Sequence, residues 1–311
     1  MKPPEARERL PDVLSGRYRI ERLLGAGGMG VVYQARDLLH ELMGEPDPCI
    51  AIKVLNDDLA TARDADALLY SEFALTRRLH HPHIVRSYAF GVDDECNQAF
   101  MTLEFMRGVR LDRVLNENPG GLPWAQARAI ATPLLGALTY VHENGVLHGD
   151  VKPENIMLTE RGLRLFDFGL GQPVDGVLTG LPQLNRQHLQ PWTPRYAAPE
   201  VRDGGPLTTQ ADVYAVARVL YEMAAGRKAL MDVSDLQSCP VRGASSLRKP
   251  EGLPSACWSE LRVALMADIR ERTISARQLL DVYQSASNRR FWRWGRAMIT
   301  HKCPPTTRVS P

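Results

Sequence analysis

One short stretch of the chain concentrates side chains that can act on a phosphate group. The motifs HGDVKPEN and DFG occupy residues 148–155 and 167–169, and six of their positions carry the argument: Asp150, Lys152, Asn155, Asp167, Phe168 and Gly169. At roughly 5% usage per residue type, chance produces this set at this spacing on the order of once in 10⁵ chains of such length. The spacing therefore indicates a functional site.

The chemistry of phosphoryl transfer requires these residue types. Little covalent work falls to the protein, so catalysis depends on positioning and on neutralising charge. Asp167 and Asn155 offer the hard oxygen ligands that Mg²⁺ prefers. Asp150 can orient an attacking hydroxyl and accept its proton, and Lys152 can neutralise charge that develops on the transferred group.

A glycine-rich segment near the N-terminus has the pattern G-x-G-x-x-G. It consists of Gly25, Ala26, Gly27, Gly28, Met29 and Gly30, and it is followed by Val31 and Val32. A strand-forming sequence comes next, whereas a dinucleotide-binding fold would place a helix there. A hairpin without side chains lets backbone N–H groups approach phosphate oxygens. A hairpin that merely joins two strands is the alternative.

Lys53 and Glu72 are predicted to form an ion pair. Lys53 lies in the apolar strand of residues 50–55, where an outward-facing lysine is the simpler interpretation. Glu72, however, is spaced three or four residues from Leu68, Leu69 and Leu75, on the apolar face of a predicted helix. A buried carboxylate is costly without a partner. A lysine from the adjacent strand would satisfy it and, held rigid, could pair with phosphate oxygens.

The pattern of elements predicts an α+β fold with two lobes. Strand-forming runs at 31–33 and 50–55 are separated by a loop at 45–48, and helical spacing follows at 62–80, 124–142, 210–225 and 275–287. Pro133 lies inside the second of these helices, without a functional explanation. We expect a lead-in over 1–16, a β-rich N-lobe over 17–106, a helical C-lobe over 107–287 and a tail over 288–311.

Composition excludes several classes of protein. The chain has 311 residues, of which 44% are hydrophobic and 24% charged, as in ordinary globular proteins. Its five cysteines are scattered without CxxC spacing, which argues against disulfide frameworks and zinc sites and favours the cytoplasm. We expect no signal peptide and no membrane span. Before the C-terminal tail, 36 acids outnumber 32 cations, so nucleic acid is not an expected partner.

Taken together, these motifs resemble those of the eukaryotic-like Ser/Thr protein kinases of bacteria, from about Arg17 to Ala286. The resemblance implies a bilobal kinase fold that binds ATP with Mg²⁺ or Mn²⁺ and phosphorylates protein substrates, itself included. Gly25–Gly30 would cover the nucleotide, with Lys53 on its α- and β-phosphates and paired to Glu72. Asp150 would be the catalytic base beside Lys152, and Asn155 and Asp167 would hold the metal.

The resemblance assigns further residues. Leu103 falls at the gatekeeper position, Glu104 to Met106 at the hinge that binds adenine, and three residues would sandwich the adenine ring: Val32, Ala51 and Met157. Glu200, which closes the motif Ala198-Pro199-Glu200, should pair with Arg272, and Asp212 should brace the catalytic loop. Thr193 matches the threonine that contacts Asp150 and Lys152, which favours Ser or Thr as the acceptor.

One position departs from the family. Gly149 stands where arginine usually anchors a phosphorylated activation loop. The segment from Asp167 to Pro199 contains two residues of the Ser/Thr type, Thr179 and Thr193. We hypothesise that activity does not require phosphorylation of this loop. His-Gly-Asp also occurs in kinases of small alcohols, such as aminoglycoside and choline phosphotransferases, and these remain an alternative. A non-catalytic pseudokinase scaffold is a second.

The tail mixes cations with aromatic residues. Residues 289–296 read RRFWRWGR, and no acidic residue follows Asp281. A solvated arm whose aromatics pack on the large lobe is the simpler interpretation. The alternative is weak contact with anionic lipid at the inner face of the membrane. A regulatory partner is expected, but the sequence does not identify it.

Overall fold

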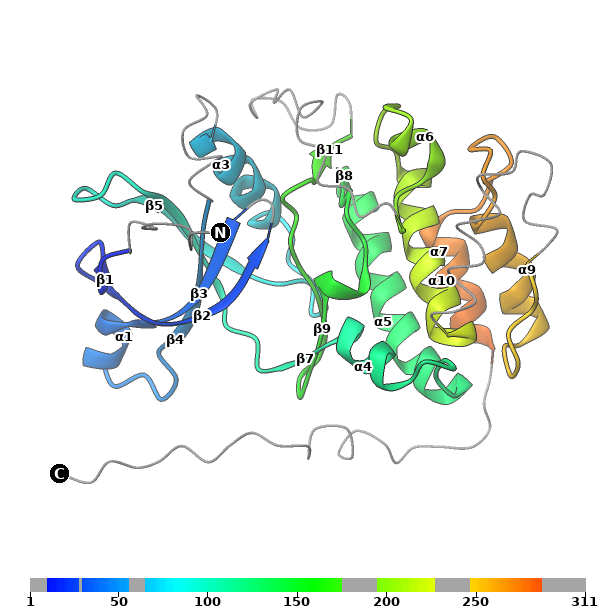
Figure 1. The fold of residues 1–311 in the computed structure, drawn as a ribbon, viewed down its shortest axis with the longest axis horizontal. Coiled ribbons are helices and arrows are strands. Elements are labelled where there is room, and N and C mark those ends of the chain that lie inside the picture. Colours follow the sequence, from blue (N-terminus) through cyan, green and yellow to red (C-terminus); the bar gives the residue numbers. More distant parts are fainter. Residues whose placement is uncertain (1–9, 28–29, 56–64, 175–194, 227–246, 287–311) are drawn as a thin grey trace, which may run out of the picture.

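The computed structural model describes residues 10–27, 30–55, 65–174, 195–226 and 247–286. Figure 1 shows a sheet at one end of these residues and a bundle of helices at the other. Gly28, Met29, Thr179, Thr193 and the basic tail lie outside the described residues. The predicted α+β bilobal architecture is confirmed.

The N-lobe is a six-stranded antiparallel sheet with strand order β1-β2-β3-β4-β6-β5. Its strands are β1 (Val13–Leu14), β2 (Tyr18–Gly27), β3 (Gly30–Asp37), β4 (Cys49–Val54), β5 (Ser87–Val92) and β6 (Ala99–Glu104). Helix α3 (Ala65–Thr76) packs on this sheet, and a small cluster beneath it joins Leu69 and Phe73 to Met101 of β6. Because α3 packs on the sheet that contains β4, a lysine on β4 can reach a side chain on the helix.

The N-lobe differs from the prediction at two helices. A short helix, α1 (Leu38–Leu42), was not predicted; Asp37 caps it by accepting hydrogen bonds from Leu39 and His40. Helix α3 ends at Thr76 rather than near residue 80, and the chain turns before Pro82. Pro82 disfavours helical backbone at residue 81 and so limits how far the helix could run, although α3 ends five residues before that position.

The C-lobe begins with β7 and is built on two long helices. Its elements are β7 (Gly108–Arg110), α4 (Leu111–Glu117), α5 (Trp124–Glu143), β8 (Val146–Leu147), the 3₁₀ turn Pro153–Asn155, β9 (Ile156–Thr159), β10 (Gly162–Leu165), β11 (Gln172–Pro173), α6 (Pro199–Arg202), α7 (Thr209–Ala225), α9 (Ser255–Ala264) and α10 (Ala276–Ser285). Pro133 lies inside α5, as the sequence places it. No helix within the described ranges is long and apolar enough to cross a bilayer.

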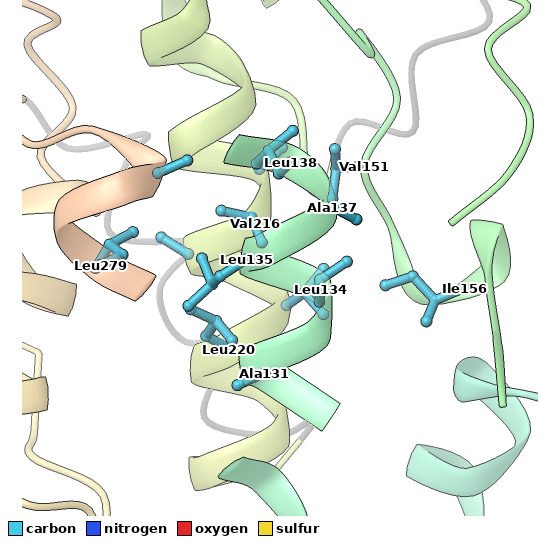
Figure 2. Close-up of a cluster of buried hydrophobic side chains, with 14 of the residues drawn as sticks. Ala131, Leu134, Leu135, Ala137, Leu138, Val151, Ile156, Val216, Leu220 and Leu279 are labelled. Carbon is cyan, nitrogen blue, oxygen red and sulfur yellow. The ribbon is translucent and has the colours of Figure 1, made fainter. Parts of the chain in front are cut away.

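The C-lobe core reaches the segment that carries the chemistry. Figure 2 shows Leu134 and Leu138 of α5 packed with Val216 of α7, beside Val151 and Ile156 from the motif region. These side chains are buried, and Val151 is 1% exposed. Residues 148–155 are therefore anchored by one apolar side chain within the segment and one directly after it.

Main-chain hydrogen bonds join the two lobes. The Leu165 N–H of β10 donates to the His83 carbonyl at 2.8 Å, and the Val85 N–H donates to the Leu165 carbonyl at 3.0 Å. Ile84 and Leu165 form a parallel bridge. We call this contact of residues 83–85 with β10 the seam.

Candidate active site

Lys53 of β4 links the two lobes through two carboxylates. Its Nζ donates to both carboxylate oxygens of Glu72 on α3, at 2.7 and 2.8 Å, and to Oδ1 of Asp167 at 2.7 Å. Lys53 and Glu72 are 6% and 5% exposed. Burial alone would lower the pKa of Lys53, but the two carboxylates outweigh it and raise that pKa above its ordinary value. The lysine is therefore a fixed positive charge.

Asp167 is held ionised by the same contact. Burial acts to raise the pKa of Asp167, but the combined effect of Lys53 and the other nearby cations is larger and opposite, so the pKa is lowered overall. Its backbone adopts a left-handed conformation with φ of 65°. Phe168, the next residue, is fully buried, and its ring lies 4.5 Å from the His148 ring. The DFG motif is thus tied to the HGDVKPEN motif by packing.

Asp150 lies between a lysine and an asparagine of its own loop. The Lys152 Nζ is 2.5 Å from Oδ2 of Asp150. The Asn155 side-chain amide donates to Oδ2 at 3.0 Å and to the Asp150 carbonyl at 2.9 Å. Burial raises the pKa of Asp150, while Lys152 opposes the rise. A carboxylate that is oriented and more basic than usual suits proton acceptance.

Asp212 of α7 supports the start of the loop formed by residues 148–155. Its carboxylate accepts hydrogen bonds from the N–H groups of His148 and Gly149, both at 2.8 Å, and lies 3.0 Å from Nε2 of His142. The side chain is 1% exposed. Burial acts to raise the pKa of Asp212, but the hydrogen bond from His142 and the neighbouring donors lower it overall. One buried acid therefore fixes two successive peptide groups before Asp150.

The position that departs from the family has no room for a side chain. Gly149 has φ of +80°, and a Cβ built there would lie 2.7 Å from the Leu170 carbonyl oxygen and 2.9 Å from a methyl group of Leu207. Arginine at this position would require the loop itself to follow another path. The glycine is thus part of the local fold of the loop.

Gly149→Ala is expected to lower the free energy of unfolding by about 2–4 kcal/mol, through left-handed backbone strain and overpacking. Urea titration checks this. Gly136→Ala is the matched control, because Gly136 lies within α5 with no atom within 4 Å of the added Cβ, and alanine there should stabilise by about 0.5–1 kcal/mol. Equal effects of the two substitutions would contradict the prediction.

The glycines of the β2–β3 hairpin divide into two kinds. A Cβ at Gly30 would lie 2.3 Å from the Val54 carbonyl oxygen, so packing against β4 requires glycine there. At Gly25 and Gly27 an added Cβ would meet no atom within 4 Å. Packing inside the described chain does not explain these two glycines, whereas close approach of a phosphate to their backbone would.

The residues expected around adenine lie on the strands that line the junction of the lobes. Ala51 of β4 pairs with Leu103 of β6, and Val32 of β3 pairs with Gly25 and Lys53. Met157 is on β9. Glu104 ends β6, and its carboxylate lies 3.3 Å from Arg164 of β10.

The donor set suits a divalent cation whose coordination is completed by phosphate and water. Asp167 and Asn155 are close to Asp150 and Lys152, as the hydrogen bonds and mutual electrostatic effects show. Because the nitrogen of the Asn155 amide donates to Asp150, its oxygen points away from that carboxylate. No cluster of three or more His, Cys, Asp or Glu with metal-ligand geometry occurs among the residues described. A two-residue set is what Mg²⁺ uses when a nucleotide supplies further ligands.

A largely buried ion pair joins two segments of the C-lobe, as the resemblance implied. Arg272 is 1% exposed and pairs with Glu200, with nitrogen–oxygen distances of 2.7 and 3.2 Å. Nearby, the Tyr196 hydroxyl donates to Glu222 at 2.5 Å. The sequence analysis missed the Tyr196–Glu222 and Glu104–Arg164 contacts, because neither lies in a motif and each depends on packing between distant elements.

Comparison with known proteins agrees with this geometry. The protein kinase domain family matches residues 18–281. Serine/threonine-protein kinase PkaA of Streptomyces coelicolor is 31% identical over 268 residues, which cover 83% of this chain and 48% of PkaA. PrkC of Bacillus subtilis is 31% identical over 217 residues, covering 69% and 31%. The chain thus spans about half or less of these relatives.

Solved structures give the same result for the fold. The crystal structure of the Mycobacterium tuberculosis PknI kinase domain is 26% identical, with a TM-score of 0.62 over 89% of this chain and 99% of that one. The sequence match covers both lobes and includes the segments that bring Lys53, Asp150 and Asp167 together. The chain therefore belongs to the protein kinase domain family and is a relative of the eukaryotic-like Ser/Thr protein kinases of bacteria.

Proposed function

We propose that the chain is a Ser/Thr protein kinase that transfers the γ-phosphoryl group of ATP to hydroxyl groups of proteins. Members of this family use ATP and a divalent metal, and we propose Mg²⁺ here, with Mn²⁺ as a substitute. The observation that carries the proposal is the position of Lys53, 2.7 Å from a carboxylate of each lobe. Such an arrangement serves a ligand held between the lobes.

Each residue has a distinct task in this proposal. Asp150 orients the acceptor hydroxyl and takes its proton, and Lys152 neutralises charge on the transferred group. Lys53, kept in place by Glu72, pairs with the α- and β-phosphates. Asp167 and Asn155 would hold the metal, which when bound neutralises phosphate charge and aligns the terminal phosphate.

The test is transfer of labelled phosphate from ATP. We expect label on protein, recovered as phosphoserine or phosphothreonine after acid hydrolysis, including label on the chain itself. A lysate provides candidate acceptors. Label on an aminoglycoside or choline instead of protein would favour a small-molecule kinase. Nucleotide binding without any transfer would favour a pseudokinase scaffold.

Activity is expected to be independent of phosphate at Thr179. Gly149 supplies no cation to anchor a phosphorylated loop, and its surroundings leave no space for one. Thr179→Ala, and the wild-type chain treated with phosphatase, should therefore retain the initial rate of protein phosphorylation. A chain that is silent after phosphatase treatment and recovers on phosphorylation of Thr179 would contradict this.

The rate is expected to fall at acidic pH with a midpoint above 3.8, the ordinary aspartate pKa. Burial raises the pKa of Asp150, and only the ionised form accepts a proton. Activity is thus complete above the shifted pKa and is lost as pH falls through it. kcat/KM against pH measures the midpoint, with circular dichroism to verify folding. A midpoint at or below 3.8 would show that another group limits the rate.

Protein substrates follow from the family, and we place the chain in the cytoplasm on its cysteine usage. Contact of residues 289–296 with a membrane surface, and a regulatory partner, stay predictions of the sequence.

A further inference from the structure

An exposed tyrosine and three arginines gather beside the seam. Tyr88 lies on β5, an edge strand of the N-lobe sheet, and is 55% exposed. Arg86 directly precedes β5, and its carbonyl accepts a hydrogen bond from the Glu104 N–H at 2.9 Å. Arg164 of β10 pairs with the Glu104 carboxylate, and Arg161 lies in the turn between β9 and β10. Both lobes therefore contribute to one surface.

The charges of this surface act on a single hydroxyl group. Contacts across the seam bring the three arginines to this place: Arg86 is joined to Glu104 through its carbonyl, and Arg164 pairs with the Glu104 carboxylate. Nδ1 of His83 lies 3.2 Å from the carbonyl oxygen of Leu163, two residues after Arg161. In agreement, partial burial and then Glu104 raise the pKa of Tyr88, whereas the three arginines act in the opposite direction.

Two of the three arginines are available for another molecule. Arg86 and Arg161 are exposed, and within the described ranges neither side chain forms an ion pair, while Arg164 is balanced by Glu104. Residues 77–86, RRLHHPHIVR, contain no acidic residue, and Glu160 is the acid of the neighbouring turn. Exposed guanidinium groups that form no ion pair within the described residues are suited to bidentate binding of an incoming carboxylate.

We propose that Arg86, Tyr88 and Arg161 form a docking surface for an acidic segment of a partner protein. The arginines bind its carboxylates, and the tyrosine offers an apolar ring with a polar end for the adjoining side chains. The surface combines separated arginines with two glutamates, Glu104 and Glu160. This spacing of charges matches the separate carboxylates of an acidic segment better than the continuous phosphates of a nucleic acid. Arg86, Tyr88 and Arg161 are not among the residues expected to bind ATP or to carry out transfer, so binding does not depend on phosphoryl transfer.

The test uses a fluorescein-labelled peptide rich in aspartate and glutamate, with an asparagine- and glutamine-rich peptide as its uncharged match. Anisotropy titration of the full chain should show binding of the acidic peptide alone. The double substitution Arg86→Glu/Arg161→Glu should weaken it about tenfold or more, because two charge-assisted contacts become repulsive. Arg262→Glu is the matched control: Arg262 is exposed on α9, at the other end of the molecule (Figure 1), and its substitution should leave affinity unchanged.

Crosslinking and a catalytic-site variant provide two further tests. A photo-crosslinking version of the acidic peptide should label residues near Tyr88; label confined to the basic tail would overturn the proposal. Asp150→Asn should bind the peptide as the wild type does, so a failure of the proposed kinase activity and a failure of docking remain distinguishable. If Arg262→Glu weakened peptide binding as much as the double substitution does, binding would reflect general attraction to cations and the specific surface would be refuted. The same would follow if anionic vesicles or single-stranded DNA displaced the labelled peptide as well as unlabelled acidic peptide does.

Discussion

Asp150→Asn is expected to lower the rate of phosphoryl transfer to protein by a factor of about 10² to 10⁴, the usual contribution of a general base. The substitution retains the size of the side chain and an oxygen that can accept from the Asn155 amide. What is lost is the ability to take a proton, together with the charge opposite Lys152. The measurement is the initial rate of phosphate incorporation at saturating ATP.

Nucleotide binding provides the control for this substitution. Lys53, Glu72 and Asp167 keep their mutual contacts, so the dissociation constant for ATP should change little. Loss of transfer with retained binding would locate the defect in the chemical step. Turnover equal to that of the wild-type chain would mean that another group accepts the proton.

Asp212→Ala is expected to lower the free energy of unfolding by about 1–5 kcal/mol, because a buried N–H group loses its acceptor at about 1–3 kcal/mol and a partly buried one loses its acceptor at a lower cost. These are the N–H groups of His148 and Gly149. The His142 ring would also lose its carboxylate partner. Activity should fall as well, even under conditions where the variant is fully folded, because the loop before Asp150 loses its support.

Asp212→Asn is the graded control. It keeps one acceptor oxygen for a backbone N–H and replaces the other by a donor, so its effect on stability should be intermediate. Urea titration gives the stability of each variant, and kcat measured well below the unfolding midpoint gives the effect on activity. Asp212→Ala with wild-type stability would show that water replaces the carboxylate, contrary to its 1% exposure.

The fold was predictable because the sequence carries both periodicity and motifs. The helix predicted over 124–142 is observed as Trp124–Glu143, because its long apolar spacing and the Asn144-Gly145 sequence after it define it. The helix predicted over 210–225 is observed as Thr209–Ala225, again because of its long apolar spacing. The short helix α1 was missed. With only five residues, it depends on Asp37 as its cap, and Arg17, in the turn before the neighbouring strand β2, holds that carboxylate.

One contact of the candidate site, the ion pair between Lys53 and Glu72, could be predicted from a burial argument. The position of Glu72 on an apolar face called for a cationic partner, and Lys53 lies 2.7 Å away. The additional contact of Lys53 with Asp167 could not be derived from spacing, because 114 residues separate the two. Gly30 shows the converse: it was grouped with the phosphate-binding glycines, while the backbone of β4 supplies a sufficient reason for it.

The seam has a mechanical consequence. Because two main-chain hydrogen bonds fasten residues 83–85 to Leu165, the sheet cannot slide as a whole across the helical half. The N-lobe can instead rotate relative to the C-lobe about the seam. Displacement is then smallest beside Tyr88 and Arg164 and grows with distance from the seam, toward Gly27 and Gly30 on β2 and β3. A ligand bound at the seam would move with both lobes at once, whereas one bound far from the seam would experience a changing distance between the lobes.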